Sequence, residues 1–246
     1  VRGLNEIGKR KTLFNWIEQK QIDIVCLQET FINKDAINNI QKDWKGTIIW
    51  SPTNSTHSRG CAIMFSHTFE FEVINFIADA DGRKLMVNFS HLGQVYSICS
   101  IYAPNAENHR KDFFNQLNKW VVNHSLNQNS LIVCGDFNTT ITSKDKMGSQ
   151  ATNDSARKNL VNLLTRLNLT DVLRHTHPDS QIYTYYNKSR TVQSRIDYIF
   201  ASSFILNRNK RISTLYPPKI PDHKMVLLTI KDEVLSGKGY WKLNTS

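Results

Sequence analysis

Apolar and polar residues are arranged along this chain in short runs that predict many strands and few helices. Residues 22–28 form a nearly continuous apolar run, which is typical of a strand buried on both faces. Another apolar run begins at Leu131, and apolar residues alternate with polar ones over 84–92, which indicates one buried face. The remaining predicted strands cover 61–66, 69–77, 94–104, 181–187, 195–201 and 225–230.

Apolar residues recur at helical spacing over 9–20 and 107–123, and a third helix is predicted to begin at Asp154 or Ser155, either of which can cap it. Several successive strands are close enough to be antiparallel, whereas single helices separate others. This mixture predicts an α/β fold, a four-layer α/β sandwich in which two mixed β-sheets are packed face to face and flanked by helices. A doubly wound sheet is the alternative.

Composition favours one soluble domain with a polyanionic partner. The chain has 246 residues and a net charge of +10, from 31 basic and 21 acidic side chains. Such a surplus suits nucleic acid, although many basic proteins bind none. No apolar run approaches the roughly 18 residues of a membrane span, and the first residues carry no signal-peptide core. The four cysteines lack the spacing of a zinc site, so we expect free thiols in the cytosol or nucleus.

Polar groups capable of chemistry stand where predicted strands become loops. They are Glu29, Tyr102, Asp136, Asn138, Asp197, Asp222 and His223. Each alone has a plainer explanation, since Glu29 can cap a loop, Tyr102 can be a core residue, and Asp197 can pair with Arg195. Because strand ends converge at one edge of a sheet, we expect these groups to meet.

Such a set supports metal-assisted cleavage of a phosphodiester. Carboxylate oxygens favour Mg²⁺, with Mn²⁺ as a possible substitute, and a bound cation stabilises charge on phosphate oxygens. A histidine that is hydrogen-bonded to a carboxylate can stay protonated beside a phosphate. An aspartate positioned by an asparagine can take a proton from the attacking water.

The motifs "LQET", "IYAP", "GDFN", "RIDYI" and "DH" occur in an order that resembles the endonuclease/exonuclease/phosphatase superfamily. The sequences of the segments "KRKTLFNWIEQKQIDIVCLQET" and "YTYYN" are most similar to the apurinic-like endonuclease domain of LINE-type non-LTR retrotransposons. The last residues resemble the start of a linker toward a reverse transcriptase. We therefore expect a nuclease-like domain over 1–231 and an exit linker over 232–246, covalently joined to a reverse transcriptase in a longer protein.

The resemblance implies a role for each strand-end residue. It assigns Glu29 and Asp222 to the metal, Asp136 to proton transfer, Asn138 to orientation of phosphate or water, Tyr102 to a phosphate contact, and Asp197 to a pair with His223. Thr184 matches a family position near the DNA backbone. The segment 187–195 also lacks an apolar anchor, and we interpret it as a hairpin loop whose Lys188, Arg190 and Arg195 contact a DNA groove.

Two departures from the family pattern bear on activity. The first family motif begins with an asparagine that would lie just before Val1, and Pro221 stands where a serine usually precedes the Asp-His pair. The expected function is a Mg²⁺-dependent endonuclease that acts in the nucleus. It would nick double-stranded target DNA and leave a 3′-hydroxyl that primes reverse transcription.

Three alternatives remain. The first is an abasic-site repair endonuclease or exonuclease, against which Ser194 argues because those enzymes carry Trp there. The second is a phosphatase of inositol or sphingolipid phosphates. The third is a degenerate domain that binds nucleic acid without cutting it.

Overall fold

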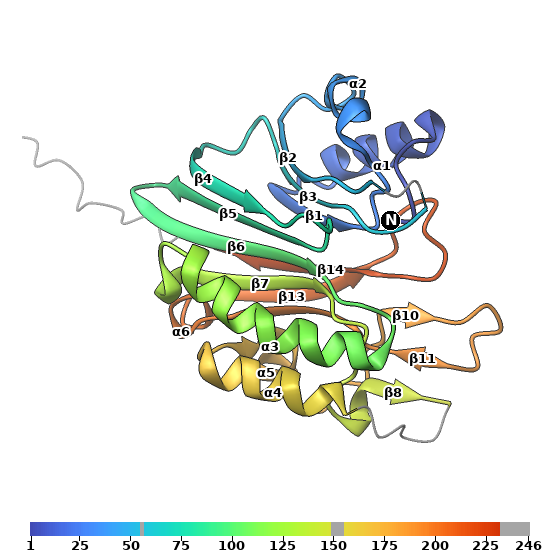
Figure 1. The fold of residues 1–246 in the computed structure, drawn as a ribbon, viewed down its shortest axis with the longest axis vertical. Helices are drawn as coiled ribbons and strands as arrows, with labels where there is room; N and C mark the ends of the chain where they lie inside the picture. Colours follow the sequence, from blue (N-terminus) through green and yellow to red (C-terminus); the bar gives the residue numbers. More distant parts are fainter. Residues whose placement is uncertain (55–56, 149–154, 232–246) are drawn as a thin grey trace, which may run out of the picture.

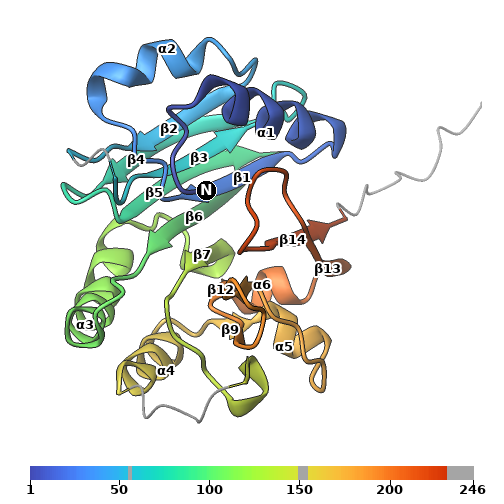
Figure 2. The same ribbon diagram turned by 90° about the vertical axis from the view of Figure 1, so that its right-hand side faces the viewer.

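Two layers of β-strands form the centre of the molecule, and helices cover both outer faces (Figures 1 and 2). The computed structural model describes residues 1–54, 57–148 and 155–231. One layer is a sheet of six strands, in which β6 and β7 are parallel and the other neighbours are antiparallel. Its order is β4 (Glu72–Ala78), β5 (Lys84–His91), β6 (Gln94–Tyr102), β7 (Leu131–Asp136), β12 (Asp197–Ala201) and β9 (Thr170–Asp171).

The facing layer consists of two separate antiparallel pieces. One runs in the order β1 (Ile24–Gln28), β3 (Cys61–Phe65) and β2 (Thr47–Ser51), and the other pairs β13 (Lys210–Leu215) with β14 (Met225–Ile230). A small sheet of β10 (Tyr185–Tyr186), β11 (Gln193–Ser194) and β8 (Lys146–Met147) lies at one end of the molecule (Figure 1).

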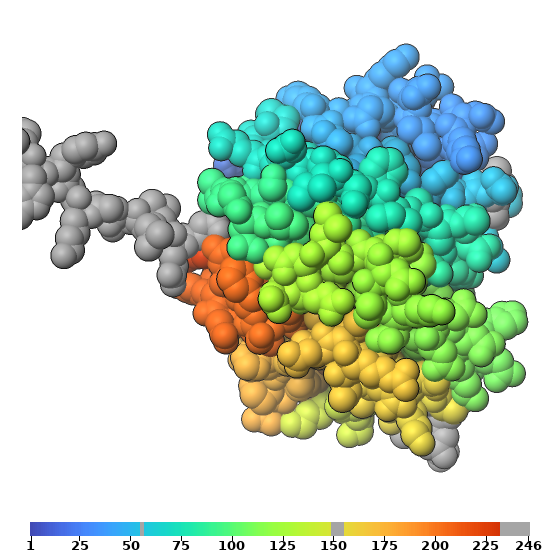
Figure 3. Space-filling view, turned by 60° about the vertical axis from the view of Figure 1, so that its left-hand side comes forward, coloured from blue at the N-terminus to red at the C-terminus, as the bar shows by residue number. Residues whose placement is uncertain are grey.

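Helices close the two outer faces. The helices α1 (Ile7–Gln19) and α2 (Ile37–Gln41) lie over the β1–β3–β2 piece, whereas α3 (Glu107–His124) and α4 (Ala156–Arg166) cover the six-stranded sheet (Figure 2). The shorter helices are α5 (Val172–Thr176), α6 (Ser203–Leu206) and the 3₁₀ turns Lys34–Ala36, Gln128–Ser130 and Ser143–Asp145. On the outer surface α6 (orange) lies beside the turn before β7, where the Ser202 hydroxyl donates to the Asn129 carbonyl (Figure 3).

Three apolar cores separate the layers. Leu85 and Val87 of β5 pack against Phe65 of β3 between the two sheets. A second core lies between the six-stranded sheet and its helices, and a third joins α1 to β1 and β3. Because full burial of a Leu, Val or Phe side chain contributes about 1.5–3 kcal/mol, these cores fix the order of the layers. The predicted four-layer α/β sandwich is confirmed, but only the six-stranded sheet is mixed, since both pieces of the facing layer are antiparallel.

The sequence pattern located most elements but not all. It missed β2 and β13, and the strand predicted over 181–187 is reduced to the two residues of β10. Ser155 precedes α4 as predicted, but its hydroxyl binds the Glu107 carboxylate instead of capping the helix. Asp154 and the exit linker predicted over 232–246 lie outside the described residues.

The four cysteines are free thiols, as expected. Within the described ranges, the helices are too short or too polar to span a bilayer.

Candidate active site

Neighbouring strands place three polar side chains in one row. The parallel pairing of β6 with β7 sets Tyr102 opposite Asp136, and the antiparallel pairing of β7 with β12 sets Asp136 opposite Asp197. Because β12 runs the other way, its first residue lies at the edge where β6 and β7 end. The expected convergence of strand ends at one sheet edge is therefore present.

The backbone at the end of β7 and in the loop after it holds Asp136 in place. Gly135 has a φ of +133°, and a Cβ there would lie 2.1 Å from the Ile101 carbonyl oxygen, so only glycine fits. Asn138 adopts a left-handed φ of +49°, which asparagine tolerates better than most residues. Its backbone N–H donates to Asp136 Oδ1 at 2.9 Å, and its Nδ2 donates to the Ala103 carbonyl at 2.8 Å. The carboxylate and the amide are thus fixed relative to each other.

Asp136 is almost fully buried, with 8% of its surface exposed. Burial and the negative charge of Asp197 together raise the pKa of its carboxyl to about 7, with His223 opposing the rise. A carboxylate with a pKa near neutrality is suited to accept a proton, because it is both available and basic at that pH.

Asp197 and His223 form a hydrogen-bonded pair, in which Nδ1 of the imidazole lies 3.0 Å from Oδ2 of the carboxylate. Burial lowers the pKa of His223, but the charge and the hydrogen bond of Asp197 outweigh it and raise that pKa to about 9. The ring is therefore protonated at neutral pH. The predicted pair is present. The alternative, a pair between Asp197 and Arg195, is not formed, because Arg195 pairs with Asp145 and Asp171 instead.

Asp197→Asn is expected to lower the pKa of His223 clearly from its value of about 9. Without the charge and the hydrogen bond of Asp197, burial disfavours the charged ring, and the negative charge of Asp136 opposes this only in part. NMR titration of the His223 ring measures this directly. An unchanged titration in the variant would show that Asp197 does not set the charge of His223.

Thr184 does not lie where the resemblance placed it. The residue is fully buried, and its Oγ1 accepts the backbone N–H groups of Ile196 and Asp197 at 3.2 and 3.1 Å. A hydroxyl with both contacts inside the protein is not available to a DNA backbone. We therefore correct its role, since Thr184 holds the start of β12 and so positions Asp197.

Thr184→Val is expected to destabilise the protein by about 1–3 kcal/mol, because two inward-facing N–H groups lose their acceptor. The same change is expected to lower the pKa of His223, since Asp197 is no longer fixed beside it. Urea unfolding and NMR titration measure the two effects, and Thr184→Ser restores the hydroxyl as a matched control. Normal stability together with weakened DNA binding would instead support the original backbone contact.

Arg195 also requires a correction, because its side chain is 1% exposed and cannot reach DNA. Its guanidinium bonds Asp145 at 2.8 Å and Asp171 at 2.7 Å, and Arg174 shares Asp145 at 2.7 Å. This buried ion cluster joins the small end sheet to the six-stranded sheet. The predicted hairpin loop is present between β10 and β11, but of its predicted basic contacts only Lys188 and Arg190 are exposed.

The carboxylates assigned to the metal line one cavity with Asp136, Asp197 and His223. Glu29 follows β1, and the hydroxyl of Tyr102 donates to its Oε1 at 2.5 Å. This contact places Tyr102 beside the carboxylate, and its contact with phosphate stays a prediction. Burial and the neighbouring Glu29 raise the pKa of Tyr102 above its ordinary value, so the phenol stays neutral.

Asp222 faces the cavity with one oxygen still free to bind. Its Oδ2 pairs with Arg2 at 2.5 Å, whereas its buried Oδ1 has no hydrogen-bond partner among the described residues. Such an orphaned carboxylate oxygen is the kind of ligand that a hard cation such as Mg²⁺ prefers, and Glu29 brings a second carboxylate to the same cavity. Asp136, Asp197 and His223 also offer ligand atoms within 4.8 Å of one another, but the latter two are already bonded to each other.

Two cationic side chains at the site had no signal in the sequence. Arg2 pairs with Asp222, and the Arg83 guanidinium lies 5.1 Å from the centre of the Tyr102 ring and donates to the Tyr102 carbonyl at 3.0 Å. The folding of the chain brings both side chains to the site, and neither composition nor the spacing of motifs predicts these contacts.

The four-layer sandwich thus carries a row of carboxylates and a paired histidine at one sheet edge, a set of groups suited to proton transfer. The model of the Endonuclease/Exonuclease/phosphatase family matches residues 1–218. The chain belongs to this family, as the order of its motifs predicted.

The chain is similar to a transposon protein and to endonucleases of known structure. The chain is 28% identical over 237 residues to the Transposon TX1 uncharacterized 149 kDa protein of Xenopus laevis, covering 95% of this chain but only 18% of that protein. An AP endonuclease structure from Archaeoglobus fulgidus is similar with a TM-score of 0.75 and 21% identity, covering 94% of this chain and 97% of that one. The endonuclease domain of TRAS1, a telomere-specific non-LTR retrotransposon, has a TM-score of 0.68 and 16% identity, with 92% and 93% covered.

Proposed function

We propose that this protein is a Mg²⁺-dependent endonuclease that nicks intact duplex DNA. The observation that carries the proposal is the single cavity shared by Glu29, Asp136, Asp197, Asp222 and His223. It combines a proton acceptor with a pKa near 7, a protonated histidine and two carboxylates that fit a hard cation. Together these groups supply what hydrolysis of a phosphodiester requires.

Each residue acts from the position that the fold gives it. Asp136 takes a proton from the attacking water, and Asn138, anchored to Ala103, keeps that carboxylate oriented. His223, held protonated by Asp197, faces the charge that develops on the phosphate oxygens. Glu29 and Asp222 would hold Mg²⁺, which supplies positive charge to the phosphate when bound.

The proposal that the substrate is DNA rests on the net charge of the protein and on the proteins to which it is similar. The net charge of +10 favours a polyanion, and the exposed Lys188 and Arg190 extend from a hairpin beside the site. The similarity to a transposon protein and to a retrotransposon endonuclease domain supports a role in insertion. In that role the nick leaves a 3′-hydroxyl, which primes a reverse transcriptase carried by a longer polypeptide in the nucleus.

Duplexes with and without an abasic site test this choice of substrate. The hairpin between β10 and β11 offers basic and hydroxyl side chains instead of an apolar pocket, so we expect similar cleavage rates on both duplexes. The product of the intact duplex is also expected to be extended by a DNA polymerase without further processing. A strong preference for the abasic duplex would establish a repair endonuclease in place of the proposed function.

Lys188→Ser combined with Arg190→Ser is expected to change where the protein cuts more than how fast it cuts. The loss of two phosphate contacts is also expected to reduce the slope of log binding constant against log salt by about 2. Mapping of nicks on one plasmid and salt titrations of binding measure the effects. Lys158→Ser with Arg211→Ser, exposed on α4 and β13, removes the same charge elsewhere as a control. Equal effects in the two double variants would show that the hairpin has no specific role.

A further inference from the structure

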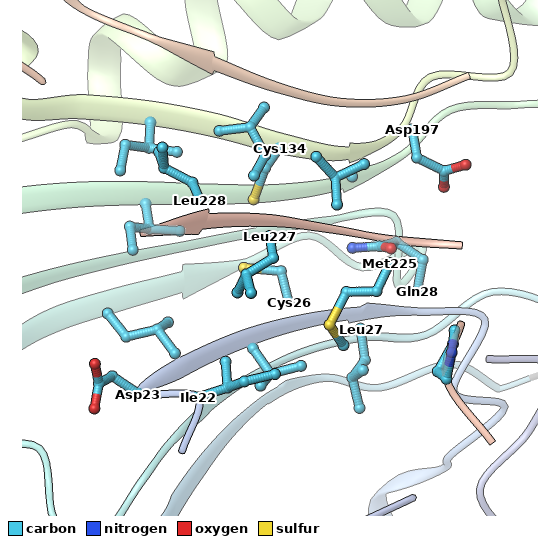
Figure 4. Close-up of a pocket in the computed structure, with 18 of the residues that line it drawn as sticks. Ile22, Asp23, Cys26, Leu27, Gln28, Cys134, Asp197, Met225, Leu227 and Leu228 are labelled. Atoms are coloured by element: carbon cyan, nitrogen blue, oxygen red, sulfur yellow. The ribbon is translucent and has the colours of Figure 1, made fainter. Parts of the chain in front are cut away.

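An exposed tyrosine lies beside the candidate active site. Asp197 and Met225, the first residue of β14, are among the residues that line the cavity of that site (Figure 4). Met225 pairs with Leu215, the last residue of β13, so the next residue, Tyr216, leaves β13 next to Lys224. Within the described ranges Tyr216 is the only exposed tyrosine, with 58% of its surface open to solvent. The fold therefore presents an aromatic ring at the rim of the site.

Lys224 places a positive charge against this ring. Its backbone N–H donates to the Thr184 carbonyl at 2.7 Å, which joins it to the chain just before β10. Its Nζ lies 4.7 Å from the centre of the Tyr216 ring and 5.0 Å from that of Tyr186, within the range of cation–π attraction. No carboxylate of the described residues forms an ion pair with Lys224. The charge of this side chain is therefore available to an anion.

The two tyrosines next to Lys224 differ in their freedom. Tyr186 is half-buried, its hydroxyl donates to the Tyr183 carbonyl at 3.0 Å, and its N–H donates to the Asp222 carbonyl at 2.9 Å. These bonds fix Tyr186 as a support. The centre of the Tyr216 ring lies 6.5 Å from that of Tyr186, with the two planes at 35°. We call Tyr186, Tyr216 and Lys224 the Tyr216 platform, in which Tyr216 is held by its neighbours but keeps more than half of its surface open to a ligand.

A tyrosine ring beside an available ammonium matches the two parts of a nucleotide. Every base has a π face that can stack on an aromatic ring, and a lysine ammonium binds backbone phosphate without reading sequence. A base inside a duplex is already stacked on its neighbours, so only an unpaired base can reach an exposed ring. Because Lys224 directly follows His223 and lines the same cavity, this nucleotide would lie next to the phosphate that is cut. A phosphate contact alone would leave the exposed ring without a ligand.

We propose that the Tyr216 platform stacks an unpaired base beside the cut, with Lys224 on a phosphate of the same nucleotide. This inference rests on the proposed function and narrows its substrate to DNA whose strands are separated next to the nick, as at a fork. Stacking on tyrosine tolerates any base, so the platform selects local strand separation and not a base sequence. Tyr216 is then a specificity-determining residue, and Lys224 contributes affinity.

A forked DNA with 5-bromouracil as its first unpaired base tests the proposal by binding and by crosslinking. Both are measured in EDTA, so neither depends on cleavage. The fork is expected to bind about tenfold more tightly than a fully paired duplex of the same strand length, the gain from stacking one base. Irradiation is expected to join the bromouracil to Tyr216, which mass spectrometry of the peptides identifies.

Variants of the platform separate stacking from a simple phosphate contact. Tyr216→Ser is expected to reduce the affinity for the fork to that for the paired duplex, whereas Tyr216→Phe keeps the ring and the preference. Lys224→Gln is expected to weaken binding of both DNAs and to lower the salt slope by about 1. Phe204→Ser removes another exposed ring, on α6 before the start of β13, and is the matched control with no expected effect.

The outcome for the platform is distinct from the outcome for the proposed function. Equal losses on fork and paired duplex in Tyr216→Ser, or a crosslink to a residue other than Tyr216, would overturn the platform. A protein that nicks duplex DNA in Mg²⁺ but binds the fork no more tightly would also overturn it, while the proposed function would stand. A preference for the fork that depends on Tyr216, in a protein that cuts no DNA, would support the platform and contradict the proposed function.

Discussion

Replacing Asp136 with asparagine is expected to slow DNA cleavage by about 10²–10⁴-fold, the contribution of a positioned general base. The amide has the same shape and keeps an oxygen that accepts the Asn138 N–H, but it cannot take a proton from water. Single-turnover cleavage at saturating metal measures the loss. A rate within a few-fold of the original protein would remove Asp136 from proton transfer.

Asp136→Asn is also expected to stay folded, so a loss of cleavage in this variant reflects catalysis and not stability. The pKa of Asp136 is about 7 in the folded protein against 3.8 for a free aspartate, so ionisation of this carboxyl opposes folding. That cost grows as pH rises from about 4 to about 7 and is then constant. Asparagine has no such cost, so Asp136→Asn is expected to unfold at the same or a higher temperature at neutral and alkaline pH. Thermal unfolding across this pH range checks the sign.

Arg195→Met is expected to destabilise the protein by about 3–5 kcal/mol, the usual result of removing one partner from a buried ion pair. Burial raises the pKa of Asp145, but Arg195 holds it below its ordinary value, and Asp171 bonds the same guanidinium. Methionine fills the volume but leaves these carboxylates without their shared cation.

Urea unfolding of Arg195→Met measures this loss, and Lys188→Met on the exposed hairpin is the matched control with no expected change in stability. The pair of variants also distinguishes the buried role of Arg195 from the DNA contact that the sequence suggested. Normal stability of Arg195→Met together with weakened DNA binding would show that the buried cluster is not the function of this residue.

The fold was predictable where apolar periodicity is long and regular. The helix around Leu13 buries one face, and the alternating residues Leu85 and Val87 of β5 face one core, although Met86 between them is buried in another, so local patterning located both elements. The strand β2 was missed because its five residues form a short apolar run without clear alternation, which strands and helices share. The division of the facing layer could not be predicted, since it depends on which strand edges meet.

The candidate site was predictable in its members but not in its contacts. Polar residues at the ends of strands, Asp136 in β7 and Asp197 in β12, gave the row of carboxylates, and the family pattern gave the His223 pair. The partners of Arg195 are 50 and 24 residues away in the sequence, so nothing near Arg195 indicated that it is buried. Likewise, the hydroxyl of Thr184 meets backbone N–H groups 12 and 13 residues later, a contact that only the folded chain creates.

Supercoiled plasmid DNA free of damage tests the central claim most directly. The protein is incubated with it in Mg²⁺ and in EDTA, alongside Asp136→Asn as the inactive control. The proposed function predicts nicked circles that accumulate only with the unaltered protein and only in Mg²⁺. A folded protein that binds the plasmid but leaves it supercoiled in both Mg²⁺ and Mn²⁺, or that nicks equally in EDTA, would contradict the claim.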